Sequence, residues 1–83
     1  GNAGEDVAIL NHTLLSLREF YKDIPLVRTE SFFSRATEDA VKFMQTVFGV
    51  TEDGVVNLDM YLKIIDESKR LKRFYPSKAI TRD

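Results

Sequence analysis

Hydrophobic residues recur at intervals of three and four between Glu5 and Tyr21, and this spacing predicts an amphipathic helix over residues 5–21. Glu5 and Asp6 fall in its first turn, where the helix dipole favours negative charge. The apolar face is wide enough to pack against two other helices, and it consists of Val7, Ile9, Leu10, Leu14, Leu15, Leu17, Phe20 and Tyr21. We expect the helix to stop before Pro25, because proline cannot continue the backbone hydrogen-bond ladder.

The same spacing predicts two more helices. The second covers residues 35–48, and Gly49 follows its last apolar pair, where a left-handed cap is favoured. A turn over residues 51–54 ends in Gly54, which supplies a positive φ. The third helix begins near Leu58 and extends through Leu71 before Pro76. Its expected core face holds Leu58, Tyr61, Leu62 and Ile65, with Ile64 beside them.

The segments that lead into the second and third helices are built alike. Residues 30–34 and 53–57, an offset of 23, both run through an acid, a small residue, two apolar residues and a helix-capping residue. The capping residues are Ser34 and Asn57, whose side chains can accept a hydrogen bond from a backbone N–H of the first turn. The repetition predicts two helix N-termini of similar construction.

Composition narrows the possible chemistry. Eighty-three residues, 43% of them hydrophobic, suffice for one small domain with a hydrophobic core. We expect this core to include Phe32, Phe33, Phe43 and Phe48. The absence of cysteine excludes disulfides, thiolate metal sites and a cysteine nucleophile. His12 is the only histidine and lacks the usual companions of a catalytic triad or a zinc site, so we expect it at the surface or partly buried. We therefore expect no catalytic residue, no metal and no cofactor.

Charge is distributed unevenly along the chain. Residues 1–62 hold 5 basic and 10 acidic side chains, whereas residues 63–83 hold 7 and 3. An acidic body argues against nucleic acid as a partner, and a helix-turn-helix DNA binder would need a basic recognition face that residues 35–48 lack. The basic and aromatic tail over residues 69–76 is either a helix end followed by a linker or a contact for an anionic polymer. No apolar run approaches the length of a membrane span.

Several short elements follow one another in a definite order between residues 4 and 65. Residues 7–11 are similar to the pattern Val-x-x-Leu-Gln, and residues 20–25 to Tyr-Pro-x-Ile-Pro. Residues 30–37 fall on Asp-Gly-x-Phe-Gly-Pro-x-Thr, and residues 40–45 on Ala-Val-x-x-Phe-Gln. Residues 49–57 fall on Gly-Leu-x-x-Asp-Gly-x-Val-Gly, and Met60-Tyr61 on Thr-Trp. By the order and spacing of these elements, residues 4–65 specifically resemble the peptidoglycan-binding domain family of bacterial cell-wall proteins, especially its Gram-positive form with an extended first loop.

The departures from the family pattern are conservative in structural terms. Asn11 stands for glutamine, Ser34 and Asn57 for glycine, and Tyr61 for tryptophan. Serine and asparagine are good helix caps, and tyrosine keeps an aromatic ring with a polar tip. The changes leave one alternative open, a degenerate copy that acts as a protein-interaction or propeptide-like module.

The resemblance implies an all-α fold, a compact three-helix orthogonal bundle, that binds peptidoglycan without catalysis. It implies a monomeric anchor of a larger protein, a hydrolase, at the extracellular face of the bacterial cell wall. We expect residues 1–4 to be a cloning remnant or linker and residues 5–65 the binding domain. Residues 66–83 are expected to form a helical extension and a basic tail or linker, which could bind an anionic wall polymer.

Two helix starts are the candidate ligand-binding sites. At the second helix, Phe33, Ser34, Arg35 and Thr37 could hold the carboxylate of a stem peptide through free N–H groups and the guanidinium. At the third helix, Asn57, Asp59 and Tyr61 could meet an amine or a sugar hydroxyl, with the tyrosine ring in a groove. The alternatives are plain helix capping with a solvated arginine, and a core tyrosine with a bonded hydroxyl.

Overall fold

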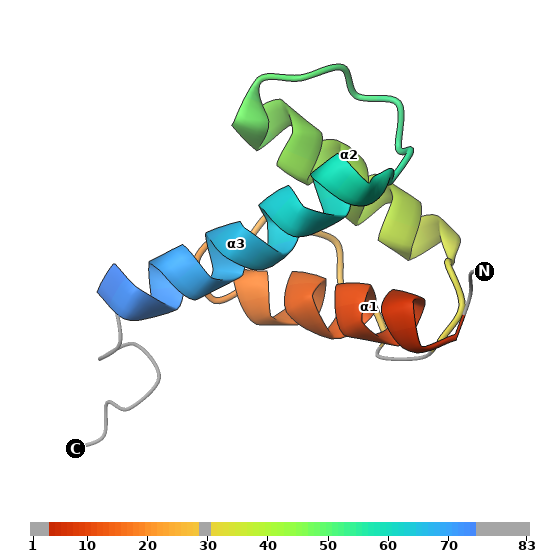
Figure 1. The fold of residues 1–83 in the computed structure, drawn as a ribbon, viewed down its shortest axis with the longest axis horizontal. Helices are drawn as coiled ribbons and strands as arrows, with labels where there is room; N and C mark the ends of the chain where they lie inside the picture. The colour runs from red at the N-terminus through yellow and green to blue at the C-terminus, as the bar shows by residue number, and fades with distance from the viewer. Residues whose placement is uncertain (1–3, 29–30, 75–83) are drawn as a thin grey trace.

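The computed structural model describes residues 4–28 and 31–74, and these form three helices without any strand (Figure 1). The helices are α1 (Glu5–Leu17), α2 (Arg35–Phe48) and α3 (Leu58–Phe74). Helix α1 packs against both α2 and α3. All three helices begin on the right of Figure 1 and run towards the left, so their N-termini gather on one side of the molecule. The predicted all-α, three-helix fold is confirmed.

The core is built from one face of each helix and from the loop after α1. Most periodic positions of α1 and α2 are buried as predicted, and Leu14, Leu17 and Met44 are fully enclosed, but Ile9 and Val47, expected on the apolar faces, are 43% and 39% exposed. Helix α1 ends at Leu17 instead of Tyr21, because the amides of Arg18 and Glu19 bond three residues back in a tighter turn. The buried hydrophobic residues are Leu10, Leu14, Leu17, Ile24, Val27, Ala40, Val41, Met44, Met60, Ile64 and Leu71.

Two expectations about the core are wrong. Helix α3 buries Met60, Ile64 and Leu71, whereas Leu58 and Leu62, expected in the core, are 71% and 53% exposed. Of the phenylalanines, Phe43 and Phe48 pack against the core, but Phe32 and Phe33 are 56% and 42% exposed. Both lie in the loop before α2, whose backbone is held to α1 by a hydrogen bond to the carbonyl of Phe32. That anchoring fixes the backbone of the loop and leaves the two rings outside the core.

Both predicted N-caps form. The hydroxyl of Ser34 accepts the N–H of Thr37 at 3.1 Å, and the hydroxyl of Thr37 accepts the N–H of Ser34 at 3.2 Å, which completes a capping box. At the start of α3, Oδ1 of Asn57 accepts the N–H of Met60 at 2.8 Å. Gly49 caps α2 in the left-handed conformation, with φ of 75°. The predicted N-caps of α2 and α3 and the predicted C-cap of α2 are therefore confirmed.

A buried amide side chain holds each loop that leads into a later helix. Asn11 in α1 donates to the carbonyl of Phe32 at 3.1 Å and accepts the hydroxyl of Thr37 at 2.7 Å. Gln45 in α2 donates to the carbonyl of Val55 at 3.3 Å and accepts the N–H of Gly54 at 2.9 Å. Phe32 and Val55 occupy the same position in the repeat of offset 23. The repetition in sequence is thus a repetition of the anchoring contacts.

The second half of α3 is part of the packed structure. Glu67 and Ser68 are buried, and Leu71 is 7% exposed. The hydroxyl of Tyr21 donates to Glu67 at 2.7 Å, and the guanidinium of Arg70 bonds the same carboxylate at 2.9 Å. These contacts lie beyond residue 65, where the predicted domain ends. The predicted tail over residues 75–83 lies outside the described residues.

Alanine substitutions at Gly54 and Gly49 should lower the free energy of unfolding by different amounts. Both glycines have positive φ, 72° and 75°, which costs a residue with a Cβ roughly 1–2 kcal/mol. A Cβ at Gly54 would also lie 2.8 Å from Cγ of Glu38, whereas a Cβ at Gly49 meets nothing within 4 Å. We expect Gly54→Ala to lower the free energy of unfolding more than Gly49→Ala, as measured by urea denaturation. Equal losses would show that the Glu38 side chain moves aside without cost.

Candidate binding site

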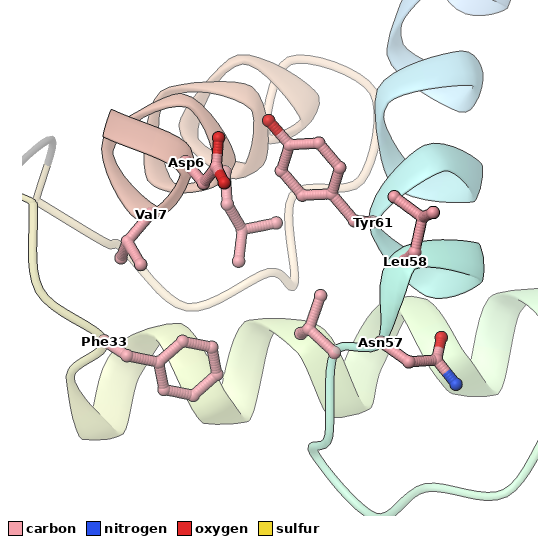
Figure 2. Close-up of a pocket in the computed structure, with 8 residues that line it drawn as sticks. Asp6, Val7, Phe33, Asn57, Leu58 and Tyr61 are labelled. Atoms are coloured by element: carbon pink, nitrogen blue, oxygen red, sulfur yellow. The ribbon is translucent and has the colours of Figure 1, made fainter. Parts of the chain in front are cut away.

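A shallow groove lies where the three helices begin (Figure 2). Its volume is about 500 Å³. Its apolar walls come from α1, from the residue before the α2 cap and from the start of α3, and they consist of Val7, Leu10, Phe33, Val56 and Leu58. Asp6, Asn57 and Tyr61 add polar atoms to this lining. The groove can therefore take a ligand that is mostly apolar and carries a few polar groups.

The groove brings together three of the predicted site residues, Phe33, Asn57 and Tyr61. Phe33 and Val56 occupy the same position in the repeat of offset 23, so both repeats contribute their second apolar residue to the lining. Asn57 also caps α3, and Figure 2 shows its amide group pointing away from the groove. Asn57 therefore contributes mainly by fixing the start of the helix that carries Tyr61.

The other predicted site residues are not among those that line the groove. Thr37 is fully buried and bonds Asn11, while Ser34 bonds Thr37 in the capping box. The side chain of Arg35 is 84% exposed and lies 3.6 Å from the carboxylate of Asp39. The N–H groups of Ser34 and Thr37 are engaged within the cap, so they are not offered to a ligand carboxylate.

Asp59 lies in a second, smaller depression of about 240 Å³, next to Asn57 and Lys63. Asp53 lines the same depression and is tied to its surroundings. The backbone N–H of Val55 and the amide of Gln45 both donate to its carboxylate at 2.9 Å. These hydrogen bonds lower the pKa of Asp53 below its ordinary value, because they stabilise the charged form. Asp53 therefore anchors the loop before α3.

Tyr61 packs partly against the core and partly lines the groove. Of its two expected placements, this is the one with the ring in a groove. Burial is the main reason that the pKa of its hydroxyl is raised, and the carboxylates of Asp6 and Glu5 raise this pKa further. Like any tyrosine hydroxyl at neutral pH, that of Tyr61 is protonated and can both donate and accept a hydrogen bond. The ring offers the groove an aromatic surface with a polar tip.

Sequence reasoning missed Asp6, Val7, Leu10, Val56 and Leu58 as lining residues. Val7 and Leu10 follow the core periodicity of α1, and Asp6 fits the usual preference for acids in a first helical turn. The available signal was the repeat, because its two copies place Phe33 and Val56 in equivalent positions. It identifies two walls of the groove but not the contribution of α1.

The described part of the chain contains no group of three or more acidic or histidine side chains that could hold a metal ion. His12 is exposed on α1, in the surface or partly buried position expected for it. None of the helices over residues 4–28 and 31–74 is long and apolar enough to cross a bilayer.

Three helices around a single core, with a groove at their common N-terminal side, define a small helical domain with a surface suited to binding. The family model of the peptidoglycan binding domain matches residues 3–64, and the chain belongs to this family. No curated protein and no solved structure gives a significant match. Membership confirms the resemblance and indicates a binding domain that associates with peptidoglycan and the cell wall.

Proposed function

We propose that this domain is a noncatalytic, monomeric module that binds peptidoglycan and thereby holds a larger protein, a hydrolase, at the wall. The proposed location is extracellular, on a Gram-positive wall. The observation that carries the proposal is the groove at the helix starts, found in a chain that belongs to the peptidoglycan binding domain family. Aromatic rings from α3 and from the loop before α2 line this groove, as is common where sugars or peptides are bound.

The groove is open to solvent, so a single contact with a wall fragment should be weak. Peptidoglycan is a polymer that offers many copies of the same fragment close together. Linked or repeated sites raise the effective concentration of ligand around a bound protein, which retains a weak binder at the surface. Weak binding at a groove is therefore sufficient for an anchoring module.

Replacing Phe33 by alanine should reduce retention on the wall. The ring lines the groove and is 42% exposed, so its removal takes away ligand contact with little effect on the core. We expect about a tenfold loss of affinity, the size of effect that one well-placed aromatic residue can have. The measurement is co-sedimentation of the 83-residue chain with insoluble sacculi over a range of sacculus concentrations.

Phe32→Ala is the matched control for this prediction. Phe32 is the adjacent ring, is 56% exposed and is not among the groove-lining residues, so its removal should leave retention unchanged. Equal effects of the two substitutions would place the binding surface elsewhere. Failure of the unaltered chain to sediment with any sacculi would overturn wall binding and favour the alternative of a protein-interaction or propeptide-like module.

A secondary contact with an anionic wall polymer is supported by the end of α3. Lys69, Lys72 and Arg73 are all exposed there, at a helix C-terminus, where positive charge is favoured. Sacculi stripped of anionic polymer test this contact separately. Retention that persists on stripped sacculi belongs to peptidoglycan, and retention lost on stripping belongs to the basic end of α3.

A further inference from the structure

The groove has one charged lining residue, Asp6, and its charge is negative. Asp6 lies in the first turn of α1 and is exposed, and Glu5 precedes it. Figure 2 shows the carboxylate of Asp6 on the same side of the groove as the ring of Tyr61. The start of a helix carries about half a positive charge, so it only partly offsets two adjacent carboxylates. The groove therefore offers a negative potential to its ligand.

Below this carboxylate the groove is apolar. Val7 and Leu10 of α1 line it, and Phe33 and Val56 contribute to the lining from the two repeats. Methylene groups of a ligand can lie along such walls, while a polar end group reaches the solvent-exposed rim. The hydroxyl of Tyr61 is a further hydrogen-bonding group of the groove.

We propose that the groove binds a primary amine at the end of an aliphatic side chain, with Asp6 as the residue that pairs with the ammonium group. In peptidoglycan this chemistry belongs to the free diamino-acid side chain of an uncrosslinked stem peptide, so the proposal rests on the proposed function. Asp6 is in this view the residue that selects the ligand, and the apolar walls hold its methylene chain.

Other wall groups fit this groove less well. A free carboxylate would face the carboxylate of Asp6, which like-charge repulsion disfavours. An N-acetylated sugar could stack on the rings of Phe33 and Tyr61, but it carries no positive charge to pair with Asp6. The dependence on the charge of Asp6 therefore distinguishes the amine from the sugar.

The test compares two synthetic stem peptides that end in lysine, one with a free side-chain amine and one with that amine acetylated. Backbone amide shifts of the 83-residue chain are followed by NMR during titration with each peptide. We expect the free amine to bind about three- to fivefold more tightly, the upper range for an exposed ion pair. In Asp6→Asn the two peptides should bind equally.

Asp23→Asn is the matched control, because it removes the same charge from an exposed position in the loop after α1, at the opposite end of that helix. It should preserve the preference for the free amine. Three results would each overturn amine recognition. The unaltered chain could bind both peptides equally, it could bind neither, or the preference for the free amine could persist in Asp6→Asn. Sedimentation with sacculi is measured in parallel. If the chain still sediments in any of those cases, wall binding stands although amine recognition fails. If the chain does not sediment, the proposed function itself is refuted.

Discussion

Replacing Gln45 by leucine is expected to lower the free energy of unfolding by about 3 kcal/mol. The Gln45 side chain is 2% exposed and bonds three consecutive residues of the loop before α3, namely Asp53, Gly54 and Val55. Leucine keeps most of the volume but removes every one of these hydrogen bonds. The buried N–H of Gly54 then has no acceptor, and an unsatisfied buried group costs about 1–3 kcal/mol by itself. Urea denaturation followed by circular dichroism measures the loss.

Thr46→Val is the control, since Thr46 is the next residue of α2 and its exposed hydroxyl bonds the carbonyl of Lys42 at 3.1 Å. Loss of an exposed hydrogen bond of this kind should change the free energy of unfolding by less than about 0.5 kcal/mol. If both variants lose equally little stability, the Gln45 side-chain amide does not anchor the loop before α3. The loop also carries Val56 into the groove, so Gln45→Leu should weaken retention on sacculi as well.

A chain that ends at residue 65 should be much less stable than one that ends at residue 74. The shorter chain lacks Leu71, whose burial is worth about 1.5–3 kcal/mol, and it removes the Glu67 partner of the Tyr21 hydroxyl. Together these losses amount to about 3–4 kcal/mol, a large share of the 5–15 kcal/mol that stabilises a typical domain. Thermal unfolding of the two chains, followed by circular dichroism, gives the comparison.

The chain that ends at residue 74 is the reference because it keeps every contact described for α3. Coincident melting of the two chains would show that the second half of α3 contributes nothing to the folded unit. In that case the domain would end near residue 65, as expected from the family pattern. A large drop in melting temperature would instead extend the folded unit to the Glu67 and Leu71 contacts.

Local signals predicted the helices well because they depend on neighbouring residues. The bounds of α2 were predicted from its spacing, from Ser34 before it and from Gly49 after it, and the structure agrees. The face of α3 could not be predicted in this way. Its buried side includes the polar residues Glu67 and Ser68, and Glu67 is bonded by Tyr21, which lies 46 residues away, so hydrophobic spacing pointed to the side with Leu58 and Leu62.

The candidate site was predictable only in part for a similar reason. Phe33, Asn57 and Tyr61 were found because they flank helix starts, and these starts do meet at the groove. Whether Ser34 and Thr37 face a ligand or each other depends on the buried contact with Asn11, which no local pattern shows. The part played by Asp6 follows from the packing of α1 beside α3, which is a tertiary property.

The three polar anchors link the helices in a closed circle. Asn11 of α1 holds the approach to α2, Gln45 of α2 holds the approach to α3, and Glu67 of α3 holds Tyr21 just after α1. No helix can leave the structure without breaking two of these links. The arrangement makes the unfolding of each helix depend on the others, so a domain of this small size gains the cooperativity of an all-or-none transition.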